Sequence, residues 1–262
     1  MSALLAAVLA AAVATAGWQA RALTGTGALA ATAVGTALLA ATGWAGAAAL
    51  ATFFLSSSII SRIGPPKRLI VGDPKGNRRD HWQVLANGGP AALGALVARD
   101  QPGLALWVAT SSLAAAGADT WATSLGAWSR PAPRHLFTWR PVSPGTNGGV
   151  TLLGCLGALV GAALIAGAGG LVGHRPTLVG AAVAIGFCGM LLDSALGASV
   201  QGAFRCPACA EVSEWRVHRC GTRTIRVGGW DWLNNDGVNA LATGFAALAG
   251  WCTWLWLAPG SP

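Results

Sequence analysis

The chain has 262 residues, of which 53% are hydrophobic and only 10% are charged, whereas about a quarter of the residues are charged in a typical soluble domain. The apolar residues form long uncharged blocks, each about long enough to cross ~30 Å of hydrocarbon. This composition excludes an ordinary soluble domain and predicts an all-α polytopic membrane protein. The net charge of +8 lies in loops between the blocks, so topology and anionic lipid head groups explain it, and we expect no nucleic-acid partner.

About eight apolar blocks are predicted to span the bilayer in chain order. The first has no positive segment before it and is followed by Arg21, which favours a retained span over a cleaved signal peptide. Residues 22–60 are too long for one crossing, and a turn near Gly43 would divide them. We therefore expect one membrane domain over residues 1–262, with a polar loop at 201–236 before the last span. The predicted spans are 2–20, 22–42, 44–61, 82–98, 103–118, 148–172, 176–200 and 237–258.

The basic residues are distributed unequally between the two sides of this predicted topology. Fifteen of the 17 Lys and Arg residues fall in alternate loops on one side, and only Arg99 and Arg175 fall on the other. Positively charged loops stay in the cytoplasm during insertion. The pattern therefore predicts an integral plasma-membrane protein with cytoplasmic long loops and with both termini outside.

Polar residues recur at the predicted cytoplasmic ends of consecutive spans. Asn87 lies near the start of one span, Asp119 closes the next, and Asp193 lies within a later one. Asn234, Asn235, Asp236 and Asn239 open the last span. Ionisable residues inside a membrane are functional candidates, because they are expensive to place there. We therefore expect a site where these span ends meet.

Carboxylates are the candidate metal ligands of this site, because they are hard oxygen donors that hold Mg²⁺. Asp119, Asp193 and Asp236 are the predicted magnesium ligands, and with Thr123, one helical turn from Asp119, they are the predicted catalytic residues. Other interpretations stay open. Asp119 could pair with Arg130 or Arg134, Asp193 could bond a neighbouring Ser or Asn, and Asn235 with Asp236 could cap a helix.

The turn from Pro144 to Gly149 is a candidate phosphate cradle. A glycine-rich turn that enters a helix can present bare backbone N–H groups to an anion, although such turns also serve only to reverse the chain. Basic residues could neutralise the same phosphates, or they could simply set the topology. The predicted phosphate-binding groups from these stretches are Gly145, Thr146, Gly148, Gly149, Lys75, Arg78, Arg79 and Arg134.

A second cluster of potential ligands lies in the predicted cytoplasmic loop. Cys206 and Cys209 have the spacing of a zinc knuckle, and His218 and Cys220 follow within fifteen residues of Cys206. The spacing of the second pair is tighter than is common for zinc. Disulfides are disfavoured in the cytoplasm, so the pattern predicts either a closed structural zinc site or reduced thiols without a metal.

Several motifs together resemble the family of plant phytyl-phosphate kinase and transmembrane protein nineteen, over roughly residues 60–250. They are RRDHWQVLANGG, ADTWATSLG, SPGTNGGVT, LLDSALGASVQ, CPAC…HRCG and WLNNDGVNALAT. The resemblance implies a kinase that converts an isoprenoid (phytyl or prenyl) monophosphate to the diphosphate with a nucleoside triphosphate and Mg²⁺. More remotely, the chain is similar to dolichol kinases and phosphatidate cytidylyltransferases, which use CTP.

Position by position, the resemblance implicates ten residues, among them the asparagines Asn87, Asn235 and Asn239 as nucleotide-binding groups. The others are Asp119, Thr123, Gly145, Gly148, Gly149, Asp193 and Asp236. The chain departs from the family at Ser124, where the family usually has Glu, which puts activity in doubt unless another carboxylate substitutes. Two alternatives stay open: a transporter or flippase for a lipid phosphate or small anion, and a catalytically inactive scaffold.

Overall fold

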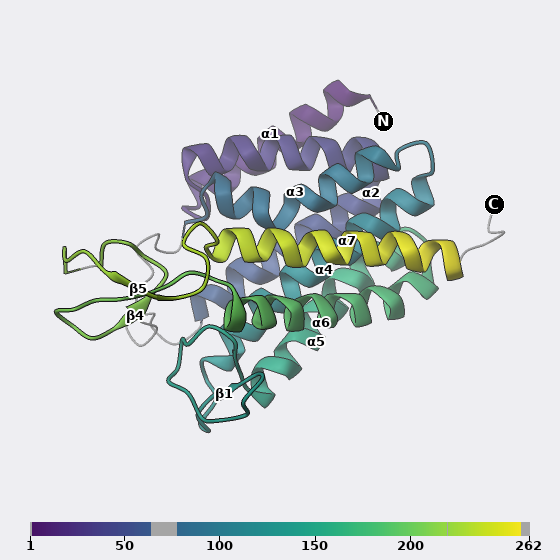
Figure 1. Ribbon diagram of the computed structural model, residues 1–262. Helices are drawn as coiled ribbons and strands as arrows, with labels where there is room; N and C mark the ends of the chain where they lie inside the picture. The colour runs from purple at the N-terminus through teal and green to yellow at the C-terminus, as the bar shows by residue number, and fades with distance from the viewer. Residues whose placement is uncertain (1, 64–77, 219, 258–262) are drawn as a thin grey trace.

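The computed structural model describes residues 2–63, 78–218 and 220–257. Within them, seven helices form one bundle, and five short strands lie at one end of it (Figure 1). The helices are α1 (Ala3–Gln19), α2 (Gly25–Ile63), α3 (His81–Val97), α4 (Pro102–Gly126), α5 (Leu152–Val172), α6 (Pro176–Ser199) and α7 (Asn235–Leu257). The strands are β1 (Arg134–His135), β2 (Gly149–Val150), β3 (Ala203–Arg205), β4 (Val212–Ser213) and β5 (Ile225–Gly228).

Helix α2 consists of two halves that fold back on each other at Gly43. Gly43 has non-helical backbone angles, φ 62° and ψ −149°, which glycine adopts without a steric penalty. Two contacts show the reversal. A Cβ placed on Gly35 would lie 3.9 Å from Leu50 of the opposite half. Arg62, near the last residue of α2, donates a hydrogen bond to the carbonyl of Ala20, which precedes the first residue of α2. The predicted turn near Gly43 is therefore confirmed.

Four helices, α2, α5, α6 and α7, are long and apolar enough to cross a membrane within the described residues. Helices α1 and α3 have 17 residues each, about 25 Å of helix, which is short for ~30 Å of hydrocarbon. The helical class is as predicted, whereas the count of eight spans stays a prediction. Each predicted span nevertheless corresponds to one helix or to one half of α2.

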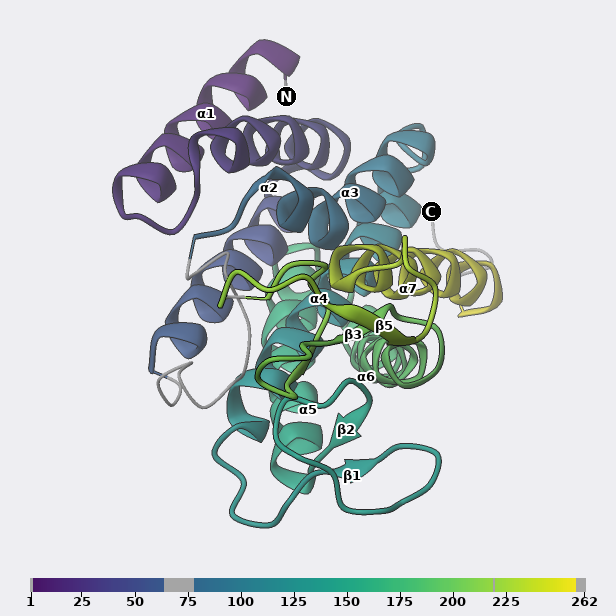
Figure 2. The ribbon, with the colours of Figure 1, turned by 60° about the vertical axis from the view of Figure 1, so that its left-hand side comes forward.

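Helix α4 is long, but it is less apolar than the four helices that could cross a membrane. Its position in the bundle explains this difference. It packs against α2, α3, α5, α6 and α7, and every residue from Leu104 to Ala118 is buried. A helix surrounded by protein needs no lipid-facing side chains, so it can carry Ser111, Ser112 and Asp119. In Figure 2, α1 lies instead at the periphery, beside α2.

Small residues allow the helices around α4 to approach closely. A Cβ on Gly161 of α5 would lie 2.7 Å from the ring of Trp121, and one on Gly189 of α6 would lie 2.6 Å from Ala115. Helices in lipid associate through such close packing rather than through a hydrophobic driving force. Buried hydroxyls add contacts, since Ser112 donates to the carbonyl of Thr243, and Thr243 donates to that of Ala86.

The strands and the long loops share one end of the bundle, here called the loop-bearing end (Figure 1). Strands β1 and β2 pair within the 127–151 connection, and β4, β3 and β5 form an antiparallel sheet within residues 201–234. The sequence predicted no strands in these loops. Two boundaries also differ from the prediction: α4 continues to Gly126, well past Asp119, and β2 separates the glycine turn from the start of α5 at Leu152.

Candidate functional site: a polar cavity at the loop-bearing end

A cavity of about 500 Å³ lies where the helix ends meet the loops. Helices α3, α4, α6 and α7 and the 144–151 segment contribute to its lining, together with the last turns of α2. Of the residues predicted from the sequence, it is lined by Asn87, Asp119, Thr123, Gly145, Thr146, Gly148, Gly149, Asp193, Asn235, Asn239 and Arg79. Polar groups from segments far apart in the chain are thus gathered at one place.

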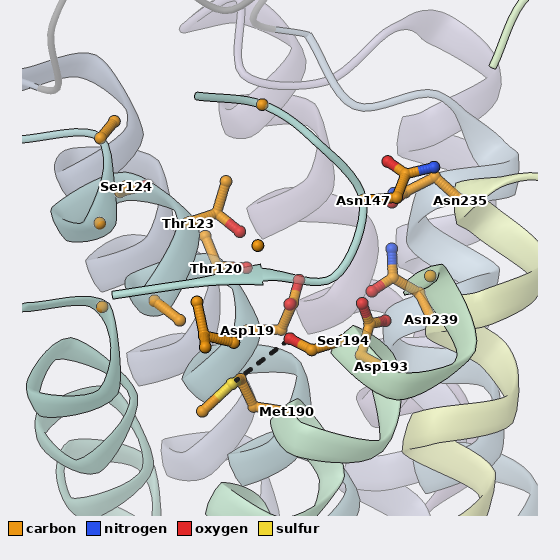
Figure 3. Close-up of a pocket in the computed structure, with 18 of the residues that line it drawn as sticks. Asp119, Thr120, Thr123, Ser124, Asn147, Met190, Asp193, Ser194, Asn235 and Asn239 are labelled. Carbon is orange, nitrogen blue, oxygen red and sulfur yellow. Dashed lines mark hydrogen bonds between the residues drawn. The ribbon is translucent and has the colours of Figure 1, made fainter. Parts of the chain in front are cut away.

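Two carboxylates lie at the same depth in this cavity. Asp119 precedes the last residue of α4, Gly126, by seven positions, and Asp193 precedes the last residue of α6, Ser199, by six, so each lies about 10 Å inward along its helix. Figure 3 shows both side chains and that of Asn239 directed into a common space. The predicted convergence of these residues at one end of the bundle is present in the structure.

Asp193 carries the clearest sign of a missing partner. Its Oδ2 atom is buried and has no hydrogen-bond partner among the described residues. A buried charged oxygen without a partner is strongly unfavourable. Carboxylate and amide oxygens are the ligands that Mg²⁺ prefers, and Asp119 and Asn239 offer more of them beside Asp193. The donor set therefore fits a hard divalent cation.

Arg79, which lies two residues before α3, contributes positive charge to the cavity lining. Its guanidinium lies 5.6 Å from the ring centroid of Phe53 and 5.5 Å from that of Phe54, while its Nη1 is buried without a partner among the described residues. The backbone of Arg79 is fixed by hydrogen bonds with Ala22 and Thr24. Burial lowers the pKa of Arg79 to about 10, so the side chain stays charged at neutral pH and can bind an anion.

The glycine turn is shaped by its contact with α6. Gly145 and Gly148 have φ values of +84° and +72°. A Cβ on Gly148 would lie 2.3 Å from the Cβ of Ala198 and 2.9 Å from the carbonyl of Ser194, so only glycine fits. The turn therefore packs against Ser194, the residue that follows Asp193, and lies at the cavity (Figure 3).

The backbone amides of this turn are only partly available to a ligand. The N–H of Thr146 donates to the carbonyl of Ser143, and the N–H of Gly149 donates to that of Thr146. The N–H groups of Gly145, Asn147 and Gly148 donate to no backbone carbonyl of the described residues. The start of α5, capped by Thr151, also lines the cavity and directs the positive end of its helix dipole there. An anion can therefore be bound, but not by every amide predicted.

Three predicted residues that the structure describes are not part of the cavity lining. Asp236 lies in the first turn of α7, about 100° around the helix from Asn235. Arg134 donates to the carbonyl of Trp139, and Arg78 donates to that of Leu23, so both guanidinium groups support the loops. Lys75 lies outside the described residues.

Several lining residues were not predicted to belong to the site. Arg62, near the end of α2, and Gln201, just after α6, line the cavity although neither was among the predicted site residues. Asn147, the one amide side chain of the glycine turn, also lines the cavity and was not among the predicted site residues. Ser124 also lines the cavity, so a longer side chain at this position could reach into it.

The second predicted cluster is assembled in the 201–236 loop. The potential ligand atoms of Cys206, Cys209, His218 and Cys220 all lie within 4.8 Å of one another. The loop also contacts the cavity rim through Glu214, whose Oε2 accepts from the backbone N–H of Asn235 at 2.8 Å and from Nε2 of Gln201 at 3.4 Å. The loop that carries the second cluster thus contacts the rim of the cavity.

Comparisons with known proteins agree with a membrane protein. The chain is similar to Protein PGR of Arabidopsis thaliana, with 32% identity over 224 residues, covering 73% of this chain and 75% of that protein. It is also similar to the uncharacterized membrane protein MJ0933 of Methanocaldococcus jannaschii, with 35% identity over 154 residues, covering 57% of this chain and 62% of that one. No solved structure matches. The model of the family described as integral membrane protein DUF92 matches residues 8–247. The chain therefore belongs to this DUF92 family of integral membrane proteins.

Proposed function

We propose that the protein is a Mg²⁺-dependent kinase that transfers a phosphoryl group from a nucleoside triphosphate to an isoprenoid monophosphate at the cytoplasmic face of the plasma membrane. One observation carries the proposal: Asp119, Asp193, Arg79 and the glycine turn line the same cavity. Phosphoryl transfer depends mainly on positioning and on electrostatic stabilisation, and needs no covalent nucleophile. Phosphoryl transfer therefore requires carboxylates that bind a metal, together with a guanidinium group and free amides that bind phosphates.

The acceptor would enter from the bilayer, with its isoprenoid chain between helices and its phosphate in the cavity. An oxygen of that phosphate attacks the γ-phosphorus of the nucleotide, and the bond from this phosphorus to the β–γ bridging oxygen breaks. The products are the isoprenoid diphosphate and a nucleoside diphosphate.

The residues of the chain have separate roles in this reaction. Arg79 binds phosphate oxygens and neutralises the charge that develops on them, together with the N–H groups of Gly145 and Gly148. Asn87, Asn235 and Asn239 orient the two substrates by hydrogen bonding. A Mg²⁺ ion held by Asp119 and Asp193 would draw together and neutralise the phosphate groups.

The chain has Ser124 where the family that it resembles usually has Glu. In this chain Asp193 lines the cavity along with Ser124 and Asp119. We propose that Asp119 and Asp193 together supply the negative charge that the metal needs.

The test is product formation by the purified full-length protein in detergent micelles. Phytyl or geranylgeranyl phosphate is incubated with Mg²⁺ and each of the four nucleoside triphosphates, and the diphosphate is detected by mass spectrometry. We expect one nucleotide to give product and Asp119→Asn to abolish it. Asp100→Asn is the matched control, because Asp100 is exposed outside the cavity.

No diphosphate from any combination, while a relative with Glu at the position of Ser124 turns over, would refute the proposal for this chain. Nucleotide-independent movement of the lipid phosphate across proteoliposomes, without product, would instead favour a transporter.

A further inference from the structure

We propose that Cys206, Cys209, His218 and Cys220 form a closed tetrahedral zinc site, and that the bound zinc fixes the 201–236 loop against the rim of the cavity. The site is separate from the cavity itself, since none of the four residues lines it. The proposal does not depend on the identity of the reaction.

The spacing of the four side chains agrees with tetrahedral coordination. With Zn–S bonds of about 2.3 Å and Zn–N bonds of about 2.0 Å, two sulfur ligands lie about 3.8 Å apart and a sulfur and a nitrogen about 3.5 Å apart. The structure has 3.6 Å between the Sγ atoms of Cys206 and Cys220, and 3.1 Å between Nδ1 of His218 and Sγ of Cys220. One small soft metal ion thus fits between them.

Each pair of ligands is associated with a tight turn, and the four ligand atoms lie within 4.8 Å of one another. In the first, the N–H of Ala210 donates to the carbonyl of Cys206, and in the second, the N–H of Gly221 donates to that of His218. Ala210 and Gly221 both have a positive φ, 59° and 81°. Each turn brings the two ligands of its pair to the same side, which is how zinc knuckles present cysteines. Because three thiolates and an imidazole fill four positions, the site is structural rather than open for catalysis.

A second observation identifies His218 as a ligand rather than a packing residue. Its Nε2 lies 2.8 Å from Oε2 of Glu211, and its side chain is only 2% exposed. A carboxylate that accepts the Nε2 proton fixes the ring so that Nδ1 carries a free lone pair toward the cysteines. Such carboxylate–histidine pairs orient metal-bound histidines.

The loop needs such a fixation because it has little core of its own. All four residues of β5 are exposed, and the buried side chains between Ala203 and Arg226 are Phe204, Cys206 and His218, among those whose burial is described. So small an apolar core cannot stabilise a sheet, whereas zinc binding contributes folding free energy directly. Glu214 lies between the two tight turns in the sequence. Zinc binding, by ordering both turns, therefore also holds Glu214 against Asn235 and Gln201.

The first test is the metal content of the full-length protein, purified in detergent without chelators. We expect about one zinc per chain by elemental analysis, and, after exchange with Co²⁺, the absorption bands of tetrahedral cobalt with thiolate ligands. Cys209→Ser should reduce the bound zinc at least tenfold. Cys252→Ser is the matched control, since Cys252 is an exposed cysteine of α7, and it should retain full zinc content.

Glu211→Gln tests the arrangement without removing a ligand. We expect it to weaken zinc affinity by about 10- to 100-fold, as is typical when the partner of a metal-bound histidine is changed. A protein that contains no zinc and gives no tetrahedral cobalt spectrum, while its helices remain folded by circular dichroism, overturns the proposal. So does equal zinc loss in the Cys209→Ser and Cys252→Ser variants.

Hydrogen exchange tests the connection to the cavity. Removal of zinc by a chelator should increase amide exchange at least tenfold in residues 203–228 and at the N–H of Asn235, while the α5–α6 pair stays protected. Zinc release that leaves exchange at Asn235 unchanged would overturn the second half of the proposal, that the metal holds the rim.

Discussion

The close contact of Gly148 with α6 allows a prediction that follows directly from interatomic distances. Replacement by Ala would place a Cβ 2.3 Å from the Cβ of Ala198, whereas carbon atoms in contact are about 3.5–4.0 Å apart. The turn must therefore move by more than about 1 Å away from α6. Ala at a positive φ adds strain of about 1–2 kcal/mol. Because this turn supplies the proposed phosphate-binding amides, we expect Gly148→Ala to reduce turnover about 100-fold, the effect of a 1 Å misplacement.

Two alanine variants separate the causes in this experiment. Gly43→Ala introduces backbone strain without a side-chain clash, since φ is +62° and its Cβ would meet nothing within 4 Å. Gly180→Ala, in an open position of α6, introduces neither effect. The assays are kcat/KM for diphosphate formation and the melting temperature in detergent. We expect Gly148→Ala alone to lose activity while the bundle melts within a few degrees of the unaltered protein. Activity of Gly148→Ala equal to that of the Gly180→Ala protein would refute the reasoning.

Three further predictions concern charged groups of the cavity. If Mg²⁺ binds Asp193, the ion at a hundred times its Kd stabilises the protein by about 2.7 kcal/mol, or very roughly 5–10 °C for a chain of this size; Asp193→Asn should abolish the shift, measured by tryptophan fluorescence, and a shift that survives would contradict the assignment. Arg79→Gln should weaken nucleotide binding about 10- to 100-fold, because a charge-assisted hydrogen bond contributes about 1.5–3 kcal/mol; calorimetric titration is the measurement, and Arg99→Gln, at an exposed position, should bind normally. Ser124→Glu adds a third carboxylate to the cavity and should lower the Mg²⁺ concentration for half-maximal stabilisation about tenfold, since ligand charge raises cation affinity; weaker Mg²⁺ binding would show that this position does not reach the metal.

The helix positions could be predicted from sequence because long uncharged blocks have few alternatives in lipid. Even the reversal at Gly43 was recognisable, since the block around it is too long for one crossing. The end of α4 could not be predicted in the same way. Its last turns carry Asp119, Thr120 and Thr123, which resemble a loop by hydropathy, and only the surrounding helices make that polarity tolerable.

Whether a residue lines the cavity depends on the face of the helix on which it lies, and the spacing of residues in the sequence shows this only in part. Asn235 and Asn239 are four residues apart and face the cavity together, whereas Asp236 between them does not line it. Because one residue turns a helix by about 100°, this difference could have been derived from the sequence. The roles of Arg78 and Arg134 could not, since each depends on one backbone carbonyl that the folded loop places within reach.

The position of α4 among five neighbours also bears on how the protein is made. During synthesis α4 emerges before α5, α6 and α7, so three of the helices that later enclose it do not yet exist. A segment with Ser111, Ser112 and Asp119 is poorly held by lipid alone. A chain that stops after Gly126 should therefore be retained by insertion chaperones or degraded, and α4 should become stably embedded only once the second half of the protein has been translated.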